Sequence, residues 1–363
     1  MSQVAIVGCG VVGAAIAYHL SQLPHLQITV FERQAPAQGA TGASLGVLMA
    51  AISTKTKGNN LRMRLASVQR YNEWIPQLEA LTGRKIPFNR QGILRLCFAE
   101  DDLTRWRSLA AIRYQQGWRL ELWDPAQIAQ QLPHINLERV TGAIYSPDDR
   151  QVDPTALTLA LVAAAQHNGV EFRWGESVVT SPVQSGRCQV IQTEVASYAV
   201  DWLIVAAGLG STALTGQLGA TIDIRPVLGQ AMQMQVPHSL GHTDLQPMIT
   251  GEDTHLVPLG AGNYWVGATV EFREPESDAE PTPDPLALEL VKQRAIALWP
   301  DLAQAEIVRQ WVGLRPRPEG RPAPIIERLP GYENVIVATG HYRNGILLAP
   351  ATAERVRSWI AAH

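Results

Sequence analysis

The sequence lacks several features that would point to a specialised environment or partner. Its formal net charge over 363 residues is only −3, and it contains no Lys/Arg-rich run, which argues against nucleic-acid binding. No stretch approaches the roughly 18 uninterrupted apolar residues of a membrane span. The first three residues lead directly into an apolar run without a basic region, so we expect no signal peptide.

Cysteine is also scarce. The three cysteines, Cys9, Cys97 and Cys188, have neither the spacing of a metal site nor that of a disulfide framework. We therefore expect no metal, a reducing compartment and a cytoplasmic location. The length is enough for a sizeable core and predicts two domains.

A glycine fingerprint stands near the N-terminus. Gly8, Gly10 and Gly13 follow an apolar run and open a helical stretch over 11–23. Glu32 ends a second apolar run about 20 residues later. This order of strand, turn, helix, strand and acid is typical of a dinucleotide site. The alternative is a structural glycine turn in an ordinary α/β domain.

The chemistry of the fingerprint specifies its ligand further. Gly8 permits a tight turn, Gly10 lets the backbone approach a pyrophosphate, and Gly13 lets helix and strand pack closely. The helix N-terminus, with its free N–H groups and positive dipole end, favours the diphosphate. Glu32 would accept hydrogen bonds from the ribose hydroxyls, and its charge disfavours a 2′-phosphate. The ligand is therefore predicted to be FAD or NAD rather than NADP.

The remaining pattern mixes helices and strands. Hydrophobic periodicity and capping residues predict helices over 59–81, 101–117, 124–132, 154–168, 286–298 and 351–361. Strands are predicted over 91–98, 202–208, 231–236, 255–258, 264–270 and 335–340. The proline- and acid-rich stretch 271–285 predicts a surface loop. The strand over 202–208 stops on small residues, and the one over 335–340 ends on glycine; such endings let a ligand approach the carboxyl edge of a parallel sheet.

These elements predict a mixed α/β fold. A Rossmann-like nucleotide domain would be assembled from the beginning, middle and end of the chain, with a mainly antiparallel domain inserted. We place the nucleotide domain at 1–84, 141–222 and 309–363, and the inserted domain at 85–140 and 223–308.

The most specific segment is the run GHYRNGILLAP at 340–350. With the N-terminal fingerprint and the segments 40–47, 203–208, 266–269 and 312–316, it resembles the D-amino-acid oxidase family of FAD-dependent amine oxidoreductases, and most closely the members that oxidise glycine. The resemblance covers nearly the whole chain. It implies that the nucleotide domain binds FAD and that the inserted domain binds the substrate.

The resemblance also implies which residues hold the cofactor. The candidates are Gly8, Gly10, Val11, Val12, Gly13, Glu32, Arg33, Ala40, Thr41, Leu45, Gly46, Val47, Val178, Gly208, His341, Tyr342, Arg343, Asn344, Gly345, Ile346 and Leu347. A flexible loop is the alternative for the small-residue stretch after Glu32. Related sarcosine-type oxidases attach flavin to a C-terminal cysteine. Because the last cysteine here is Cys188, we expect non-covalent FAD.

The substrate candidates implied by the resemblance are Arg315, Arg343 and His255. A guanidinium can hold an amino-acid carboxylate bidentately, and the family's clamp falls on Arg315. Two positions depart from the glycine-oxidising members, with His255 in place of tyrosine and Val270 in place of methionine. The ring of His255 would titrate between about pH 5 and 8 and add charge beside Arg315. The alternative is an ordinary strand histidine.

The implied activity is FAD-dependent oxidative deamination of glycine or another small amino acid or amine. The imine would give a 2-oxo acid and ammonia, dioxygen would give hydrogen peroxide, and the reaction would serve thiamine thiazole synthesis with a functional link to thiazole synthase. Flavin would carry the chemistry, and no catalytic base stands out. Two alternatives stay open: a D-amino-acid dehydrogenase or oxidase of broader specificity, and a catalytically silent flavin-binding subunit. The electron acceptor, dioxygen or a quinone, and a homo-oligomeric state stay open as well.

Overall fold

The N-terminal strand lies at the centre of a six-stranded sheet. The computed structural model describes residues 1–180, 183–184, 186–272 and 282–361. The order in this sheet is β22-β23-β15-β1-β2-β9, and all neighbours are parallel except β22 and β23. Its strands are β1 (Ser2–Val7), β2 (Leu26–Glu32), β9 (Glu171–Trp174), β15 (Trp202–Val205), β22 (Ile325–Arg328) and β23 (Val335–Thr339).

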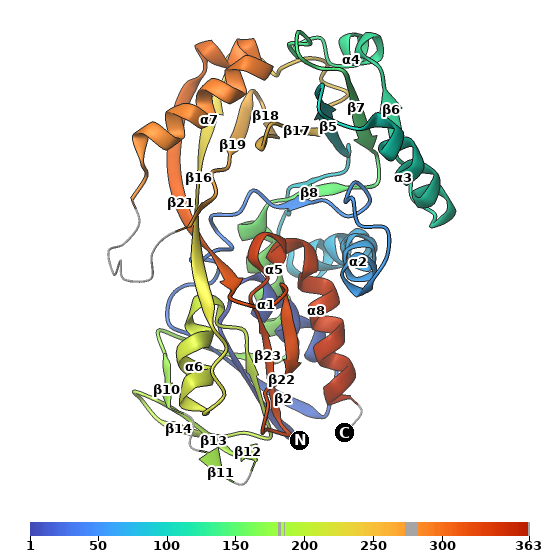
Figure 1. The fold of residues 1–363 in the computed structure, drawn as a ribbon. Helices are drawn as coiled ribbons and strands as arrows, with labels where there is room; N and C mark the ends of the chain where they lie inside the picture. Colours follow the sequence, from blue (N-terminus) through green and yellow to red (C-terminus); the bar gives the residue numbers. More distant parts are fainter. Residues whose placement is uncertain (181–182, 185, 273–281, 362–363) are drawn as a thin grey trace.

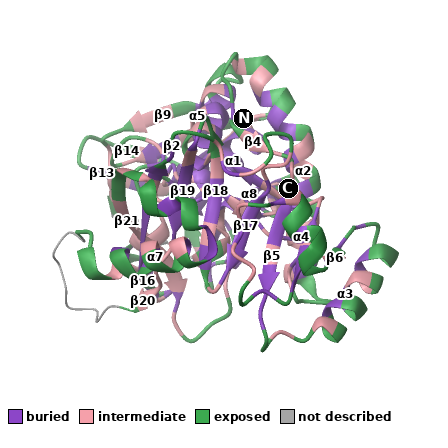
Figure 2. Cartoon of the chain, turned by 90° about the horizontal axis from the view of Figure 1, so that it is seen from above, coloured by how far each residue is buried: buried purple, intermediate pink, exposed green. Residues whose placement is uncertain are grey.

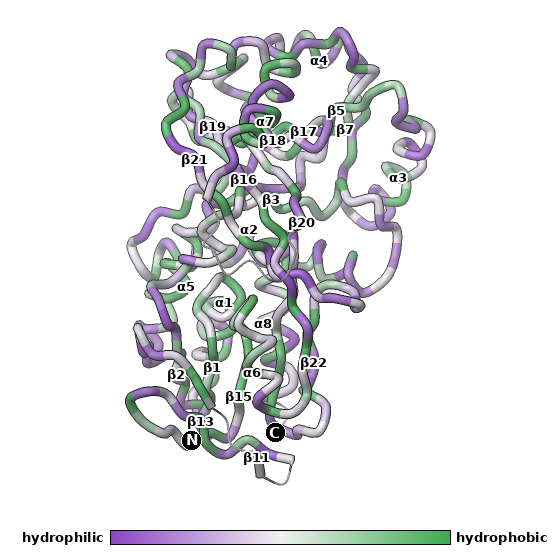
Figure 3. Tube along the Cα trace, turned by 60° about the vertical axis from the view of Figure 1, so that its left-hand side comes forward, coloured by the Kyte–Doolittle hydropathy of each residue, from purple (hydrophilic) through white to green (hydrophobic). Residues whose placement is uncertain are grey.

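Both faces of this sheet are covered, which explains why its central strands read as continuous apolar runs. Val4 and Ile6 of β1 belong to the core under the helices, whereas Ala5 and Val7 belong to a second core on the opposite face. The helices of the first face are α1 (Val11–Leu20), α2 (Asn59–Thr82), α5 (Pro154–His167) and α8 (Gly345–Ile360). Figure 3 shows the hydrophobic stretches of β1 and β15 in the lower part of the molecule.

A second, nine-stranded sheet rises above the first (Figure 1). Its order is β20-β16-β19-β18-β17-β5-β7-β6. β19 and β20 pair with successive segments of β16, and β21 pairs with β16 along its whole length. β17 and β5 are parallel, and the other pairings given for this sheet in the described residues are antiparallel. The strands are β5 (Ile93–Cys97), β6 (Glu121–Trp123), β7 (Gly142–Ser146), β16 (Ile224–Gln235), β17 (Met248–Gly251), β18 (Thr254–Gly260), β19 (Asn263–Gly267), β20 (Glu271–Phe272) and β21 (Glu306–Pro318).

Helices and small sheets complete the fold. Figure 2 shows the central strands of the large sheet buried and the outer faces of its helices exposed. The remaining helices are α3 (Leu103–Gln115), α4 (Pro125–Gln131), α6 (Ser211–Gln217) and α7 (Pro285–Leu298), with the 3₁₀ turns η1 (Gly208–Gly210), η2 (Pro300–Gln304) and η3 (Tyr342–Asn344). The small strands are β3 (Val47–Leu48), β4 (Phe88–Asn89), β8 (Arg150–Val152), β10 (Val178–Thr180), β11 (Val183–Gln184), β12 (Arg187–Cys188), β13 (Val190–Thr193) and β14 (Ser197–Ala199).

The predicted fold class is confirmed, but elements such as α8, β16 and β21 differ from the prediction. The last helix begins at Gly345 rather than at 351. The strand predicted over 231–236 begins earlier, at Ile224. The sequence did not predict its first part, because Pro226 and Gly229 interrupt the alternation of apolar and polar residues. β21 was not predicted, because it buries almost none of its side chains and so shows no apolar period. Of the loop predicted over 271–285, residues 273–281 lie outside the described part of the chain.

The predicted domain bounds stay a prediction, but one of them meets a difficulty. The bound between 140 and 141 separates β7 from β5, with which it pairs over five residues in the large sheet. We propose that this bound lies after β7, because a domain boundary should cross few contacts.

Proline inside α8 creates a local demand for a hydrogen-bond donor. Pro350 has no N–H, so the carbonyl of Ile346, four residues earlier, loses its intrahelical partner. The hydroxyl of Tyr71, fully buried on α2, donates to that carbonyl. Burial without a charged partner raises the pKa of Tyr71, which keeps the hydroxyl protonated as a donor. The contact therefore ties α2 to the first turn of α8.

Tyr71→Phe should lower the free energy of unfolding by about 1–3 kcal/mol, because a buried carbonyl loses its only donor. Urea unfolding of the flavin-bound protein measures the change. In a Pro350→Ala background residue 350 regains its N–H, so Tyr71→Phe should cost less there. Equal losses in the two backgrounds would contradict this account.

Candidate functional site

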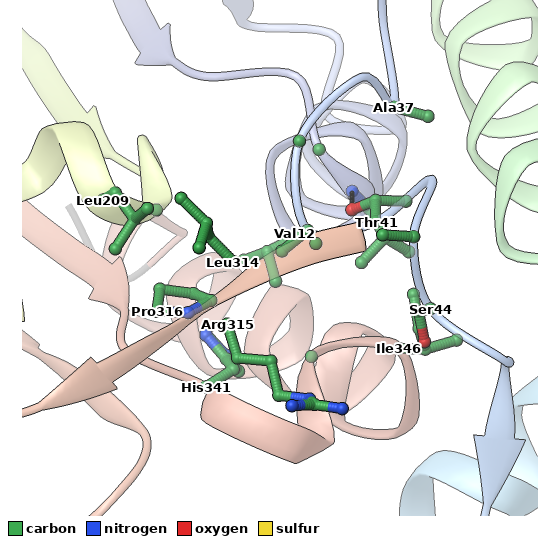
Figure 4. Close-up of a pocket in the computed structure, with 18 of the residues that line it drawn as sticks. Val12, Ala37, Thr41, Ser44, Leu209, Leu314, Arg315, Pro316, His341 and Ile346 are labelled. Carbon is green, nitrogen blue, oxygen red and sulfur yellow. Dashed lines mark hydrogen bonds between the residues drawn. The ribbon is translucent and has the colours of Figure 1, made fainter. Parts of the chain in front are cut away.

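A cavity of about 490 Å³ opens where the carboxyl ends of β1, β15 and β23 meet the long strands β16 and β21. Most of the predicted site residues line it: Gly8, Gly10, Val11, Val12, Glu32, Arg33, Ala40, Thr41, Leu45, Val47, Gly208, His255, Arg315, His341, Tyr342, Arg343, Gly345 and Ile346. Gly313 of β21, which sequence reasoning did not single out, lines it as well. Figure 4 shows Thr41 and Ser44 on one side of the view, Leu209 on the other, and Arg315 between them.

Five predicted cofactor residues are not part of the lining: Gly13, Gly46, Val178, Asn344 and Leu347. Gly13 and Gly46 allow close packing of the backbone outside the lining. A Cβ on Gly13 would overlap the carbonyl of Gly8, and a Cβ on Gly46 would overlap the carbonyl of Val152. Val178 starts β10 and packs against the core on the other face of the sheet. Its predicted contact with adenine therefore has no support from the lining.

The turn between β1 and α1 has the geometry that a diphosphate requires. Gly8 has a φ of +102°, and a Cβ there would lie 2.6 Å from the carbonyl oxygen of Ala206. Gly10 precedes α1 and offers no side chain to cap its first turn. Val11 N–H donates to Thr41 Oγ1 at 3.0 Å. The start of α1 thus faces the cavity with a positive dipole end and suits an anion.

Glu32 is held rigidly beside this turn. Its Oε2 accepts from the N–H of Cys9 at 2.7 Å, and its Oε1 accepts from the N–H of Gln34 at 3.0 Å. The carboxylate therefore stands where the fingerprint predicts contact with ribose hydroxyls. Burial and the charge of Glu32 raise the pKa of the Cys9 thiol, which is fully buried and so unsuited to bonding a flavin.

The small-residue segment after Glu32 is anchored at several points, which argues against a flexible loop. Besides the contact of Thr41 with α1, the Trp311 indole N–H donates to the carbonyl of Ala43 at 3.1 Å. Gly313 lies beside it, and a Cβ there would overlap the Cβ of Ala43. The segment can therefore wrap a bound cofactor closely.

The C-terminal run brings a second helix N-terminus to the cavity. Tyr342 adopts a positive φ of 53° in η3, and Gly345 and Ile346 at the start of α8 line the cavity. Asn344 gives no side-chain cap. His341 is buried, its Nε2 pairs with Thr352 Oγ1 at 2.9 Å, and burial lowers its pKa to about 4. His341 therefore braces the turn as a neutral ring.

Basic side chains gather at the end of the cavity nearest the large sheet. Arg315 is half-buried and donates from Nη1 to the carbonyl of Leu228 at 3.0 Å. Burial and the nearby charge of Arg343 lower the pKa of Arg315. Within the described part of the chain, neither arginine has an ion pair with a carboxylate. The two guanidinium groups at this end of the cavity can therefore bind an anion.

His255 lines the same end, but its predicted titration is wrong. Its Nδ1 pairs with Thr250 Oγ1 at 2.8 Å, while burial and Arg343 lower its pKa to about 4. The ring is therefore neutral between pH 5 and 8, because burial removes water from it and the charges of Arg343 and Arg315 oppose a further positive charge. Val270, the other predicted departure, is not part of the lining.

Comparisons with known proteins show the family of the chain. Residues 3–359 match the family model described as FAD dependent oxidoreductase. The chain belongs to this family. The resemblance to the D-amino-acid oxidase family and the prediction of FAD are thereby confirmed. The chain is 34% identical to the bifunctional protein ThiO/ThiG of Synechocystis over 99% of its own length, and it spans only 51% of that protein.

Two further matches cover both partners almost entirely. The chain is 29% identical to glycine oxidase of Geobacillus kaustophilus over 96% of its length and 90% of that enzyme. The crystal structure of glycine oxidase from the same organism superimposes with a TM-score of 0.89, covering 100% of this chain and 95% of that chain at 27% identity. Glycine oxidase from Bacillus cereus, at 24% identity and a TM-score of 0.88, shows the same fold.

The residues present fit FAD. The start of α1, which Gly10 does not cap, suits the diphosphate, Glu32 suits the ribose, and the start of α8 would favour negative charge on a reduced flavin. Within the described ranges no helix is long and apolar enough to cross a membrane, and no group of three or more His, Cys, Asp or Glu side chains could hold a metal ion.

Purified protein should be yellow and should release intact FAD on denaturation. Cys9 is buried, and neither Cys97 nor Cys188 lines the cavity, so no cysteine is placed to bond the flavin. Acid precipitation followed by chromatography of the supernatant tests this. Flavin that stays with the precipitate would refute the non-covalent prediction.

The neutral state of His255 predicts a particular pH dependence of carboxylate binding. Dissociation constants of acetate, followed by flavin absorbance, should change in parallel for wild type and His255→Gln above about pH 6. Below about pH 5 the wild type should bind acetate more tightly than the variant, because only its ring becomes charged. A divergence centred near pH 6.5 would show that the ring titrates normally.

Proposed function

We propose that this chain oxidises glycine or another small amino acid or amine to the imine, which hydrolyses to a 2-oxo acid and ammonia. For glycine the balance with dioxygen is glycine, O₂ and H₂O giving glyoxylate, NH₃ and H₂O₂. The observation that carries the proposal is Arg315, a half-buried guanidinium without an ion-pair partner among the described residues, in the same cavity as the dinucleotide fingerprint.

The chain's own residues would bind and orient the substrate. The remaining N–H groups of Arg315 can hold its carboxylate, and Arg343 adds positive potential at the same end. His255 is neutral and already pairs through Nδ1, so its other ring nitrogen can exchange a hydrogen bond with the substrate. Fixing the carboxylate fixes the Cα–H relative to the cofactor, which is the main catalytic contribution we assign to the protein.

Bound FAD supplies the redox chemistry by accepting two electrons and passing them to dioxygen. The protein residues need only supply position and electrostatics. No carboxylate or charged base is required in the cavity for this role, because the substrate amine binds in its neutral form.

The relatives support both the substrate class and a place in metabolism. Two of the proteins to which this chain is similar over nearly their full length are glycine oxidases. The bifunctional ThiO/ThiG relatives of Synechocystis and Nostoc join such a region to a second part of similar size. We propose that the product serves thiamine thiazole synthesis and that thiazole synthase is a functional partner.

A second candidate is a D-amino-acid oxidase or dehydrogenase of broader specificity. His255 and the small residue Ala268, which both line the cavity, favour it. Anaerobic bleaching of the flavin by a panel of glycine, sarcosine and D-amino acids separates the two, and oxygen uptake against quinone reduction identifies the acceptor. No bleaching by any amine would favour a silent flavin-binding subunit.

Arg315→Ala should keep the flavin spectrum but weaken substrate binding. Removing one partner of a desolvated charge pair costs about 2–5 kcal/mol, or roughly 30- to several-thousand-fold in affinity. The Michaelis constant for glycine and the dissociation constant of acetate measure it. Arg294→Ala is the matched control, because Arg294 is exposed on α7, outside the cavity. Unchanged constants in Arg315→Ala would rule out the clamp.

A further inference from the structure

Two glycines face each other across β16 and β21 at the cavity. The antiparallel register pairs Gly229 with Gly313, and both line the cavity. Neither has a positive φ, so neither is required by its own backbone conformation. A pair of residues without side chains leaves a gap on one face of the sheet. The guanidinium of Arg315 occupies the part of this gap over Gly229, and Ala43 occupies the part over Gly313.

The guanidinium of Arg315 fills the gap over Gly229. Arg315 lies opposite Val227, which places it diagonally across from Gly229 on the same face of the sheet. A Cβ on Gly229 would overlap Cζ and both terminal nitrogens of Arg315. Nη1 also donates to the carbonyl of Leu228. The guanidinium therefore lies directly on the backbone of residues 228–229.

We propose that Gly229 is the positioning residue for Arg315 and so determines how the site binds a carboxylate. The inference rests on the proposed function, since it concerns the same clamp. Any side chain at 229 would lift the guanidinium from the backbone and break its bond to Leu228. The remaining N–H groups of Arg315 would then no longer point at a fixed place in the cavity.

The fold should tolerate the change. Gly229 lies within a regular strand, and the N–H of the next residue, Gln230, is fixed by Thr269 Oγ1 at 2.9 Å. The atoms that a new Cβ would meet are the far end of a long, flexible side chain. The clash is therefore relieved by movement of Arg315 rather than of the strand.

The opposite glycine has a different task, which makes a useful contrast. A Cβ on Gly313 would meet Ala43. Ala43 belongs to the segment after Glu32, and its carbonyl accepts the hydrogen bond from the Trp311 indole. A side chain at 313 would thus disturb the segment expected to wrap the cofactor. Gly229 would govern the substrate end and Gly313 the cofactor end of one gap.

The test compares acetate with neutral acetamide on flavin-bound Gly229→Ala, using flavin absorbance. The dissociation constant of acetate should rise about 10-fold or more, as for loss of hydrogen bonds to a charged group. Acetamide binding and FAD retention should not change. Gly216→Ala, in α6 outside the cavity and with an ordinary 3.4 Å neighbour, is the matched control and should bind acetate like the wild type.

A double-mutant cycle gives the decisive readout. In the Arg315→Ala background, Gly229→Ala should have no further effect on acetate, because its target is gone. A persisting effect would overturn the proposal, as would unchanged acetate binding in the single Gly229→Ala variant.

If Arg315→Ala itself leaves acetate binding intact, the clamp of the proposed function fails and the inference falls with it. If only Gly229→Ala has no effect, the inference alone fails. Should Gly229→Ala lose FAD, recovery of FAD in the double variant would still place the clash on Arg315, and no recovery would overturn the assignment.

Discussion

The antiparallel ladder between β16 and β21 is the constraint on which the site depends. Its pairs run from Ile224 with Pro318, near the six-stranded sheet, to Gln235 with Glu306 in the large sheet. Figure 1 shows the two strands rising together from the lower to the upper part of the molecule. Because the pairing keeps one register from Ile224 to Gln233, a residue of β21 such as Arg315 is placed relative to the fingerprint turn by backbone hydrogen bonds rather than by a mobile linker.

The two ends of the cavity hold different charged groups. At the nucleotide end, Glu32 is a fixed negative group beside the start of α1, whose N-cap residue Gly10 has no side chain, a combination suited to ribose and diphosphate. At the other end, two guanidiniums stand near a neutral histidine. The same desolvation that keeps His255 uncharged makes the arginines more attractive to an anion, since water screens them less.

Sequence reasoning predicted the fold class, and most of the site residues that it singled out line the cavity, because those features depend on local pattern. Gly8, Glu32 and the run 340–350 carry their signal in short, ordered stretches. It failed where tertiary packing decides. Nothing near Gly229 in the sequence shows that Arg315, 86 positions away, occupies the space of its missing side chain. The pKa of His255 likewise depends on Arg343, which only the folded chain brings near.

The closeness of Arg315 and Arg343 has a consequence for the protein as a whole. The two charges repel each other in the folded state, and this repulsion adds to burial in lowering the pKa of Arg315, whereas the unfolded chain separates them. The folded protein thus retains a repulsion that any anion in the cavity relieves. By linkage, a carboxylate that binds only the native state shifts the folding equilibrium toward it. The cavity thereby couples global stability to the supply of small anions.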